Sequence, residues 1–263
     1  MLAERLVLRF SIPFRGILGN TAALPAKKIL YMELRDEARR SVTFSALRYD
    51  SGRLLWKDRT MPERWWVTLL GASEETLLIQ RYNPDNPEMK SLYALDAETG
   101  TLRWNREDFA FSKFHPGCLS GLTGDSERSP LVLDLKSGEI MSPVDVTEID
   151  SHKISDPVRP FLYQEGTSYR ATVSDYLSAN FGHSPEGGVE YLEFGGKVVI
   201  SYHIRARDGL TNYLLALDES GGILLQENMA SGLTGLGTDT FFVLSGCLFF
   251  VRNREELLSY QLI

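Results

Sequence analysis

Four histidines and two cysteines are the residues of this 263-residue chain best suited to metal or nucleophilic chemistry. They are His115, His152, His183, His203, Cys118 and Cys247. Zinc sites need ligands at short intervals, such as His-x3-His or paired cysteines. The chain has no His-x-His or His-x3-His spacing, and its two cysteines are far apart. The sequence therefore predicts no metal and no cofactor, and both cysteines are expected to be small buried apolar residues.

Serine and glycine motifs give no catalytic signature either. The pentapeptide Ser-Gly-Leu-Thr-Gly occurs twice, at residues 120–124 and 231–235. Neither copy is the Gly-x-Ser-x-Gly elbow of a hydrolase, and no phosphate-binding lysine follows either copy. We predict that both are loops without chemistry, and we name no catalytic residue.

The clearest pattern is architectural and lies in residues 92–104, Leu-Tyr-Ala-Leu-Asp-Ala-Glu-Thr-Gly-Thr-Leu-Arg-Trp. Apolar residues before Asp96 and after Gly100 predict two strands joined by a tight turn, because Asp binds its own backbone and Gly accepts a positive φ. Weaker copies recur, with glycines at positions 52, 138 and 222. From Gly52 through Gly100 to the last copy, the intervals are 48, 38 and 84 residues, the last being twice 42. A period of ~40–45 residues with several short strands in each repeat is typical of the blades of a β-propeller.

This Ala-x-Asp-x3-Gly-x3-Trp pattern resembles the blade repeat of quinoprotein-type (PQQ-like) propellers. The segment 92–104 matches it in full, through Ala94, Asp96, Gly100 and Trp104. Three other copies match in part, at Ala46, Gly52 and Trp56; at Asp134 and Gly138; and at Ala216, Asp218 and Gly222. The resemblance implies an uncharacterised bacterial propeller, WD40-like in architecture, whose tryptophans dock on the neighbouring blade. The enzymes of that group are longer and eight-bladed, so the resemblance implies a scaffold without the quinone or its calcium ion.

We therefore predict one all-β domain over residues 1–263, a six-bladed β-propeller. The segment 146–188 lacks the repeat, and it is either a degenerate blade or an insertion, in which case five blades are expected. Within it, Tyr169, Val173 and Leu177 fit one face of a short helix as well as irregular strands. The last repeat lacks a fourth strand, and residues 6–10 near the N-terminus are predicted to supply it and close the ring.

Composition limits the partners and the compartment. The net charge of -7 and a pI near 5.3 argue against a nucleic-acid partner, since an acidic surface repels phosphate. The first residues carry charges at Glu4, Arg5 and Arg9 and lack the apolar core of a signal peptide. No apolar run is long enough to span a membrane. We expect a cytoplasmic monomer without a membrane or nucleic-acid partner.

Ligands of propellers usually meet the loops at one face. In the loops of that face, the residues most able to make directional contacts are Arg64, Trp65, His115 and Arg159. The sequence thus favours a non-enzymatic binding module or protein-interaction scaffold that holds a protein or a small molecule at one face. The alternative is a lyase, lactonase or hydrolase with a site at the mouth of the central channel. That alternative needs two or more of Arg64, His115, Arg159 and a carboxylate to approach within ~4 Å in one channel mouth.

Overall fold

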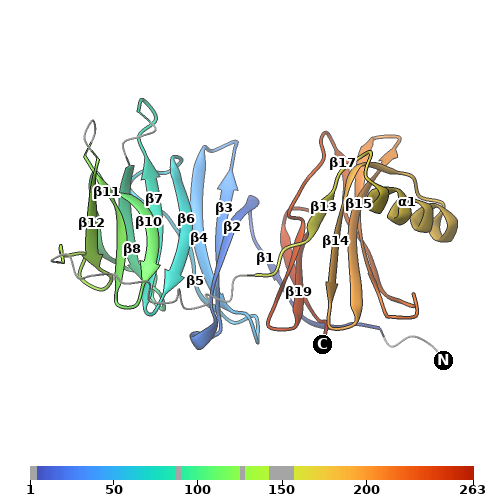
Figure 1. Ribbon diagram of the computed structural model, residues 1–263, viewed down its shortest axis with the longest axis horizontal. Coiled ribbons are helices and arrows are strands. Elements are labelled where there is room, and N and C mark those ends of the chain that lie inside the picture. Colours follow the sequence, from blue (N-terminus) through green and yellow to red (C-terminus); the bar gives the residue numbers. More distant parts are fainter. Residues whose placement is uncertain (1–4, 87–89, 125–127, 142–156) are drawn as a thin grey trace. The chain divides into compact units, whose positions relative to one another are not determined.

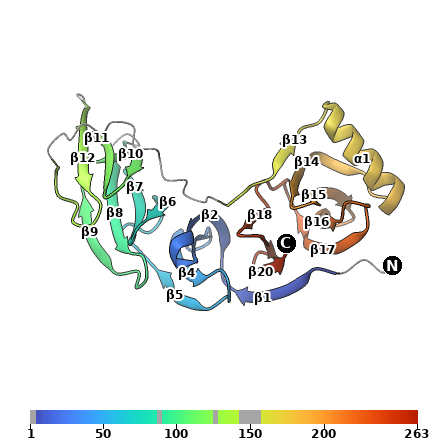
Figure 2. The same cartoon turned by 60° about the horizontal axis from the view of Figure 1, so that its bottom comes forward.

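The computed structural model describes residues 5–86, 90–124, 128–141 and 157–263. The chain divides into two compact units. Unit 1 comprises Met1–Arg15 and Pro157–Ile263, and unit 2 comprises Gly16–Asp156. Antiparallel strands dominate both units, which confirms the all-β prediction (Figures 1 and 2). The prediction of a single domain stays a prediction.

Unit 2 contains three sheets, each built from strands that are consecutive in the chain. The first sheet is β2 (Ile17–Leu24), β3 (Ile29–Asp36), β4 (Ser41–Arg48) and β5 (Leu54–Arg59), with the short 3-10 helix η1 (Pro25–Lys27) between β2 and β3. The second sheet is β6 (Val67–Ser73), β7 (Thr76–Tyr82), β8 (Lys90–Asp96) and β9 (Leu102–Arg106). The third sheet is β10 (Ala110–His115), β11 (Cys118–Thr123) and β12 (Ser129–Asp134). Such up-and-down sheets are the topology expected of propeller blades.

Unit 1 contains two more sheets and a helix. The fourth sheet is β13 (Phe161–Tyr163), β14 (Pro185–Phe194), β15 (Lys197–Ala206), β16 (Gly209–Leu217) and β17 (Ile223–Leu233), with helix α1 (Ser168–Phe181) between β13 and β14. The fifth sheet is β18 (Phe241–Leu244), β19 (Cys247–Arg252), β20 (Glu256–Gln261) and β1 (Val7–Pro13). The described residues thus form five sheets, so the predicted count of six is not confirmed.

The N-terminal strand completes the last sheet, as the sequence predicts. Strand β1 pairs with β20 in antiparallel register, from Val7 opposite Gln261 to Pro13 opposite Glu256. The sheet order β1-β20-β19-β18 therefore joins the first strand of the chain to the last. Both strands belong to unit 1.

Helix α1 occupies part of the segment that lacks the repeat. The Thr167 hydroxyl accepts a hydrogen bond from the Arg170 N–H, and Gly182 ends the helix at φ 66°. Val173 and Leu177 are buried, as the helical spacing predicts. Tyr169 does not join them: it is 67% exposed and stacks on Tyr163 with ring centroids 5.3 Å apart.

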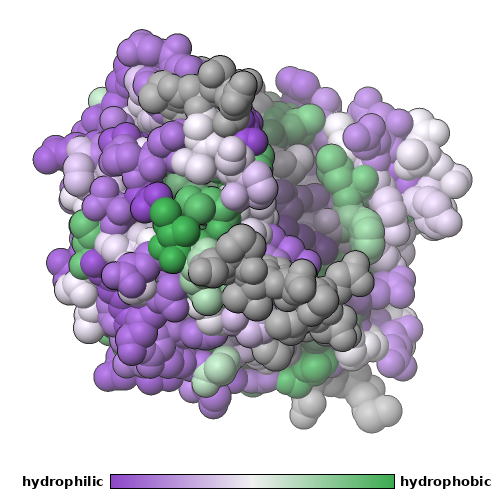
Figure 3. All heavy atoms as spheres, turned by 60° about the vertical axis from the view of Figure 1, so that its left-hand side comes forward, coloured by the Kyte–Doolittle hydropathy of each residue, from purple (hydrophilic) through white to green (hydrophobic). Residues whose placement is uncertain are grey.

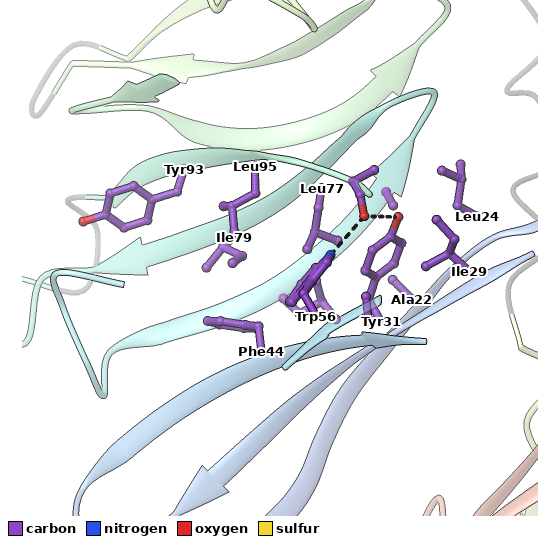
Figure 4. Packing of buried hydrophobic residues seen from close by; sticks show 14 of the residues in the cluster. Ala22, Leu24, Ile29, Tyr31, Phe44, Trp56, Leu77, Ile79, Tyr93 and Leu95 are labelled. Carbon is purple, nitrogen blue, oxygen red and sulfur yellow. Dashed lines mark hydrogen bonds between the residues drawn. The ribbon is translucent and has the colours of Figure 1, made fainter. Parts of the chain in front are cut away.

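The tryptophans of the repeat dock on the following sheet, which confirms the role predicted for them. The indole N–H of Trp56 donates to the Ala97 carbonyl over 3.3 Å, and that of Trp104 donates to the Leu135 carbonyl over 3.2 Å. Figure 4 shows Trp56 and Tyr31 reaching the same carbonyl, since the Tyr31 hydroxyl also donates to Ala97 (3.2 Å). Each ring thereby joins two sheets by burial and by one directional bond.

The aspartates of the repeat fold the turn between the third and fourth strands. Asp96 Oδ1 accepts from the N–H groups of Glu98 (3.0 Å) and Thr99 (2.8 Å). Asp134 does the same with Lys136 (3.0 Å) and Ser137 (2.7 Å). A short acceptor side chain that binds the backbone two and three residues on stabilises such turns. The repeat is therefore a turn and a docking device.

Buried polar side chains form a second link between sheets in unit 2. Glu33 on β3 is 2% exposed, and its Oε2 accepts from the Leu69 N–H (2.7 Å) and the Thr68 hydroxyl (3.0 Å) on β6. Gln80 on β7 accepts in the same way from the Phe111 N–H on β10 (3.2 Å). The register shifts next to Leu69 and Phe111, which marks β-bulges. A bulge leaves a ladder group unpaired, and these two side chains pair with it.

The two Ser-Gly-Leu-Thr-Gly segments correct the sequence prediction, because strands run through both. β11 covers most of the first and β17 the start of the second. Gly121 lies where a Cβ atom would be 2.4 Å from the Phe109 ring and from the Ala110 carbonyl. This glycine marks a close approach within a sheet, a role that a turn-based interpretation overlooks. Of the two cysteines, Cys247 is buried as expected, whereas Cys118 is only half-buried.

Candidate functional site

The four predicted site residues lie in three different places. Arg64 and Trp65 are neighbours in the loop between β5 and β6, whereas His115 ends β10 on another sheet of unit 2. Arg159 belongs to unit 1, just before β13. Arg64 is exposed, and its carbonyl accepts from the Val42 N–H over 2.6 Å. The structure gives each of them different partners, and their roles as ligand contacts stay a prediction.

Trp65 lines a hollow together with Trp66 and Tyr82, the aromatic residues at the ends of two loops. We name this hollow of about 430 Å³ the aromatic groove. Its lining residues come from β3, from the start of β6 and from the end of β7, and they are Arg35, Trp65, Trp66, Val67, Thr68, Tyr82, Asn83 and Pro84. Trp65 and Tyr82 are half-buried and Trp66 is 41% exposed, so aromatic surface is open to solvent here.

A carboxylate fixes the tryptophan loop. Glu63 accepts from the N–H groups of Trp65 (2.8 Å) and Trp66 (3.1 Å) through one oxygen. The bond from the Trp65 N–H, followed by those from Trp66 and Arg64, holds the pKa of Glu63 below its ordinary value against an opposing effect of burial. The Trp66 carbonyl in turn accepts from the Tyr82 N–H over 2.8 Å. These bonds hold the two aromatic loop ends together before any ligand arrives.

Two arginines cover the ring of Trp65. The guanidinium carbon of Arg35 lies 5.5 Å and that of Arg40 lies 5.9 Å from the ring centroid. Arg35 is itself oriented by Glu33, whose carboxylate lies 2.6 Å from its Nε, and by the Val67 carbonyl, 2.7 Å from Nη2. Such cation–π pairs fix the ring. Because Arg35 is paired with Glu33, the positive charge beside Trp65 comes from Arg40. A third cation, Lys90, lies 5.4 Å from the Tyr82 ring centroid.

His115 lines a second hollow of unit 2, of about 320 Å³. The rings of Phe111 and Phe114, 4.8 Å apart, form its apolar part. The Nε2 atom of His115 lies 2.9 Å from the Ser120 hydroxyl. Burial, and secondarily the charge of Lys113, lower the pKa of His115 and so favour the neutral imidazole. A neutral imidazole beside a hydroxyl is a pair that general-base chemistry uses, and the described contacts add no third residue that would orient the imidazole.

Arg159 approaches a carboxylate, as the enzyme alternative requires, but in an exposed setting. Its Nη1 lies 3.8 Å from Asp239, and both side chains are more than a third exposed. The N–H of Asp239 binds the buried carboxylate of Glu190, which also receives both donors of Thr240. Burial raises the pKa of Glu190 despite these bonds. This arrangement fastens the segment before β18 to the fourth sheet and is structural.

Other features of the described residues bear on the class of site. Residues 5–86, 90–124, 128–141 and 157–263 contain no group of three or more His, Cys, Asp or Glu side chains placed to hold a metal ion. Within those same ranges, no helix has the length and apolar character needed to cross a bilayer. Figure 3 shows one face on which hydrophilic side chains predominate and hydrophobic ones gather in small patches.

Of the residues that line the aromatic groove, only Trp65 was selected from the sequence, and its role as a ligand contact stays a prediction. Trp66, Tyr82 and Arg35 were not selected. The adjacent pair Trp65–Trp66 is a sequence signal for an aromatic site. The same pair also fits the core positions of a strand, and that interpretation overlooks the site. Tyr82 directly precedes an Asn-Pro-Asp turn, and only the pairing of β6 with β7 brings it to the tryptophans.

Comparison with known proteins gives one family match. Residues 24–104 match a family described as a domain of unknown function, DUF4905, which covers less than half of the chain. The matched segment contains most of the first two sheets and every lining residue of the aromatic groove. No curated protein matches this chain.

Several solved structures resemble the chain weakly. A europium-containing methanol dehydrogenase has a TM-score of 0.34 at 10% identity, over 95% of this chain and 52% of that one. BamB from Moraxella catarrhalis has a TM-score of 0.27 at 10% identity, over 97% of this chain and 99% of that one. The β-propeller domain of the Trilobed protease from Pyrococcus furiosus has a TM-score of 0.35 at 10% identity, over 92% and 78%. This chain spans about half the length of the methanol dehydrogenase.

Proposed function

We propose that the protein is a non-enzymatic binding module that holds a peptide segment of another protein in the aromatic groove. The observation that carries the proposal is the grouping of Trp65, Trp66 and Tyr82 around one preformed hollow. Tryptophan and tyrosine supply most of the binding energy where they line such hollows, because they bury a large area at low cost in side-chain entropy. Glu63 and Arg35 add rigidity, which reduces the entropy lost on binding.

We further propose that the five sheets are the blades of a propeller closed by the N-terminal strand. The repeated docking of a tryptophan on the next sheet supports this arrangement in unit 2, and the pairing of β1 with β20 supports it in unit 1. In such a scaffold the loop ends that carry the aromatic groove stand on strands covered on both faces. Rigid strands would then present the groove without rearrangement.

A random peptide library panned on the immobilised full chain tests the proposed function. Enriched peptides are then titrated into the wild type, Trp66→Ala and Phe161→Ala. Phe161 is a matched control because it is an exposed aromatic residue, 72% accessible, in unit 1. We expect Trp66→Ala to weaken binding about tenfold or more, the loss typical of a central aromatic contact, and Phe161→Ala to leave it unchanged. Failure to enrich any peptide that depends on Trp66 would refute the proposal.

The enzyme alternative has its best support in the His115–Ser120 pair. If the protein were a hydrolase acting through this pair, His115→Ala and Ser120→Ala would both abolish turnover of an activated ester. We expect any ester turnover by the protein to survive both substitutions. Measurement with p-nitrophenyl acetate, corrected for the rate in buffer, distinguishes the two functions.

A further inference from the structure

We propose that the occupant of the aromatic groove is an extended, proline-containing peptide that carries an acidic residue beside its prolines. This inference rests on the proposed function and specifies its ligand. Two properties of the described groove residues support it: the balance of hydrogen-bond donors and acceptors, and the position of the positive charges.

Three main-chain carbonyls beside the tryptophans already accept hydrogen bonds from the protein. The Trp66 carbonyl accepts from the Tyr82 N–H, and the Val67 carbonyl accepts from Arg35. The Trp65 carbonyl also faces Arg35, 3.5 Å from Nη1. The Glu63 carboxylate next to the groove is occupied by main-chain N–H groups.

The side-chain acceptors are engaged as well. The Thr68 hydroxyl donates to Glu33 over 3.0 Å and accepts from Asn20 over 3.0 Å. Asn83 Oδ1 accepts from the Asp85 N–H over 2.9 Å. Among the lining residues described, none carries a carboxylate. A ligand that must donate hydrogen bonds therefore meets few open acceptors in the groove.

Some hydrogen-bond donors of the groove, by contrast, are left without a partner in the described part of the protein. Within the described part of the chain, the indole N–H groups of Trp65 and Trp66 and the Tyr82 hydroxyl make no hydrogen bond. A suitable ligand thus offers many acceptors and few donors, together with apolar surface for the rings. Proline-rich peptide has this character, because proline lacks the main-chain N–H while its carbonyl stays available. In the polyproline II conformation those carbonyls face outward and the pyrrolidine rings pack on aromatic residues.

Positive charges beside the groove favour an acidic residue in the peptide ligand. Arg35 is paired with Glu33, so the cations considered for the ligand are Arg40, over Trp65, and Lys90, over Tyr82. Arg40 is exposed at the tip of the β3–β4 turn and can approach a ligand carboxylate. An attraction of this kind weakens as salt screens it.

A glycan is the competing occupant, since sugar rings also stack on tryptophan. Each sugar hydroxyl donates as well as accepts, so a glycan subsite needs open acceptors from the protein. The carbonyls beside the tryptophans and the side chains of Thr68 and Asn83 are engaged within the protein. The cations Arg40 and Lys90 give a neutral sugar no ionic partner. The donor–acceptor balance therefore favours the peptide.

Synthetic probes test this inference on the full chain. The peptide Pro-Pro-Glu-Pro-Pro-Glu is compared with Pro-Pro-Lys-Pro-Pro-Lys, with Ala-Ala-Glu-Ala-Ala-Glu and with cellohexaose. Binding is followed by tryptophan fluorescence and by the NMR signals of the indole N–H groups. We expect the Pro/Glu peptide to bind at least about tenfold more tightly than each of the others, and to move the Trp65 and Trp66 indole signals downfield.

Variants separate the contributions. Trp66→Ala should weaken binding of the Pro/Glu peptide about tenfold, and Tyr82→Phe, which keeps the ring and removes the donor, should weaken it by a smaller factor. Arg40→Gln should reduce the preference for Glu over Lys, and Phe161→Ala should change nothing. Equal binding of the alanine peptide, equal binding of the lysine peptide, or tighter binding of cellohexaose would each overturn the inference.

The two proposals fail in different ways. If library peptides bind through Trp66 but contain no proline, the proposed function stands and this inference is wrong. If no peptide from the library or the synthetic set binds, the proposed function itself is wrong.

Discussion

The indole ring of Trp104 covers Gly138 of the following sheet, where a Cβ atom would lie 2.5 Å from the ring. Trp56 covers Gly100 in the same way, with a Cβ distance of 2.8 Å. Both glycines also have positive φ, 73° at Gly138 and 67° at Gly100. One residue type thus meets two demands at once, a left-handed turn and room for an aromatic ring.

Truncation of the docking tryptophans should destabilise unit 2 in proportion to their burial. Trp56 is 7% exposed, so Trp56→Ala is expected to cost about 3–5 kcal/mol. Trp104 is only half-buried, so Trp104→Ala is expected to cost less than Trp56→Ala. Urea denaturation followed by circular dichroism measures both. A larger loss at Trp104 than at Trp56 would contradict the burial argument.

Removal of the Glu33 carboxylate should leave buried donors on β6 without an acceptor. We expect Glu33→Ala to lower the free energy of unfolding by at least about 1–3 kcal/mol, the cost of unsatisfied buried groups. Glu33→Gln keeps the shape and one acceptor oxygen and is expected to cost less. Urea denaturation of both variants tests this, with the exposed Glu37→Ala as control. Equal stability of wild type and Glu33→Ala would show that the Leu69 N–H finds another partner.

The Asp96 turn should make stability fall in acid. Burial opposes the charged form, but hydrogen bonds from Thr99 and Arg103 outweigh it and lower the pKa of Asp96 to about 2, from 3.8. A lowered folded-state pKa means that the stabilisation is complete above about pH 4 and disappears as the pH falls towards 2. Asp96→Asn should flatten the pH dependence of the unfolding free energy in that window. Urea titrations at pH 2 to 5 test this, and an unchanged slope would count against it.

Deletion of residues 1–12 should destabilise the fifth sheet. The deletion leaves β20 with an unpaired edge and exposes apolar residues of that sheet. We expect a lower thermal midpoint, and partial recovery when a synthetic peptide of residues 5–15 is added. A midpoint equal to that of the full chain would show that β1 contributes nothing to stability.

The sequence predicted the parts of the fold that depend on a few characteristic residues at fixed spacing. The spacing of Asp96, Gly100 and Trp104 predicts a turn between two strands and a tryptophan that docks on the next sheet. It also predicts the order of the strands, because each of these residues has a local role. The spacing of Val173 and Leu177 fits a helical face as well as irregular strands, and the structure has the helix. The missing strand of the last sheet was found from the count of strands in its repeat.

Contacts between distant strands escaped the sequence. Glu33 and Gln80 look like ordinary strand residues, and only the stacking of one sheet on the next gives them bulged N–H groups to accept from. Trp66 and Tyr82 become neighbours only through the pairing of β6 and β7. The Ser120 segment was expected to be a loop because glycine suggests turns, whereas Gly121 lies within a strand that Phe109 approaches closely.

The pairing of β1 with β20 has a consequence for protein synthesis. The ribosome releases β1 before every other described strand and β20 after all of them, so β1 waits without its partner while the strands between them are synthesised. The three sheets of unit 2 use consecutive strands and can form while the chain is still growing. The fifth sheet can form only afterwards. An unpaired edge is the part of a nascent chain most prone to aggregate, so we expect this strand to be where a chaperone acts first.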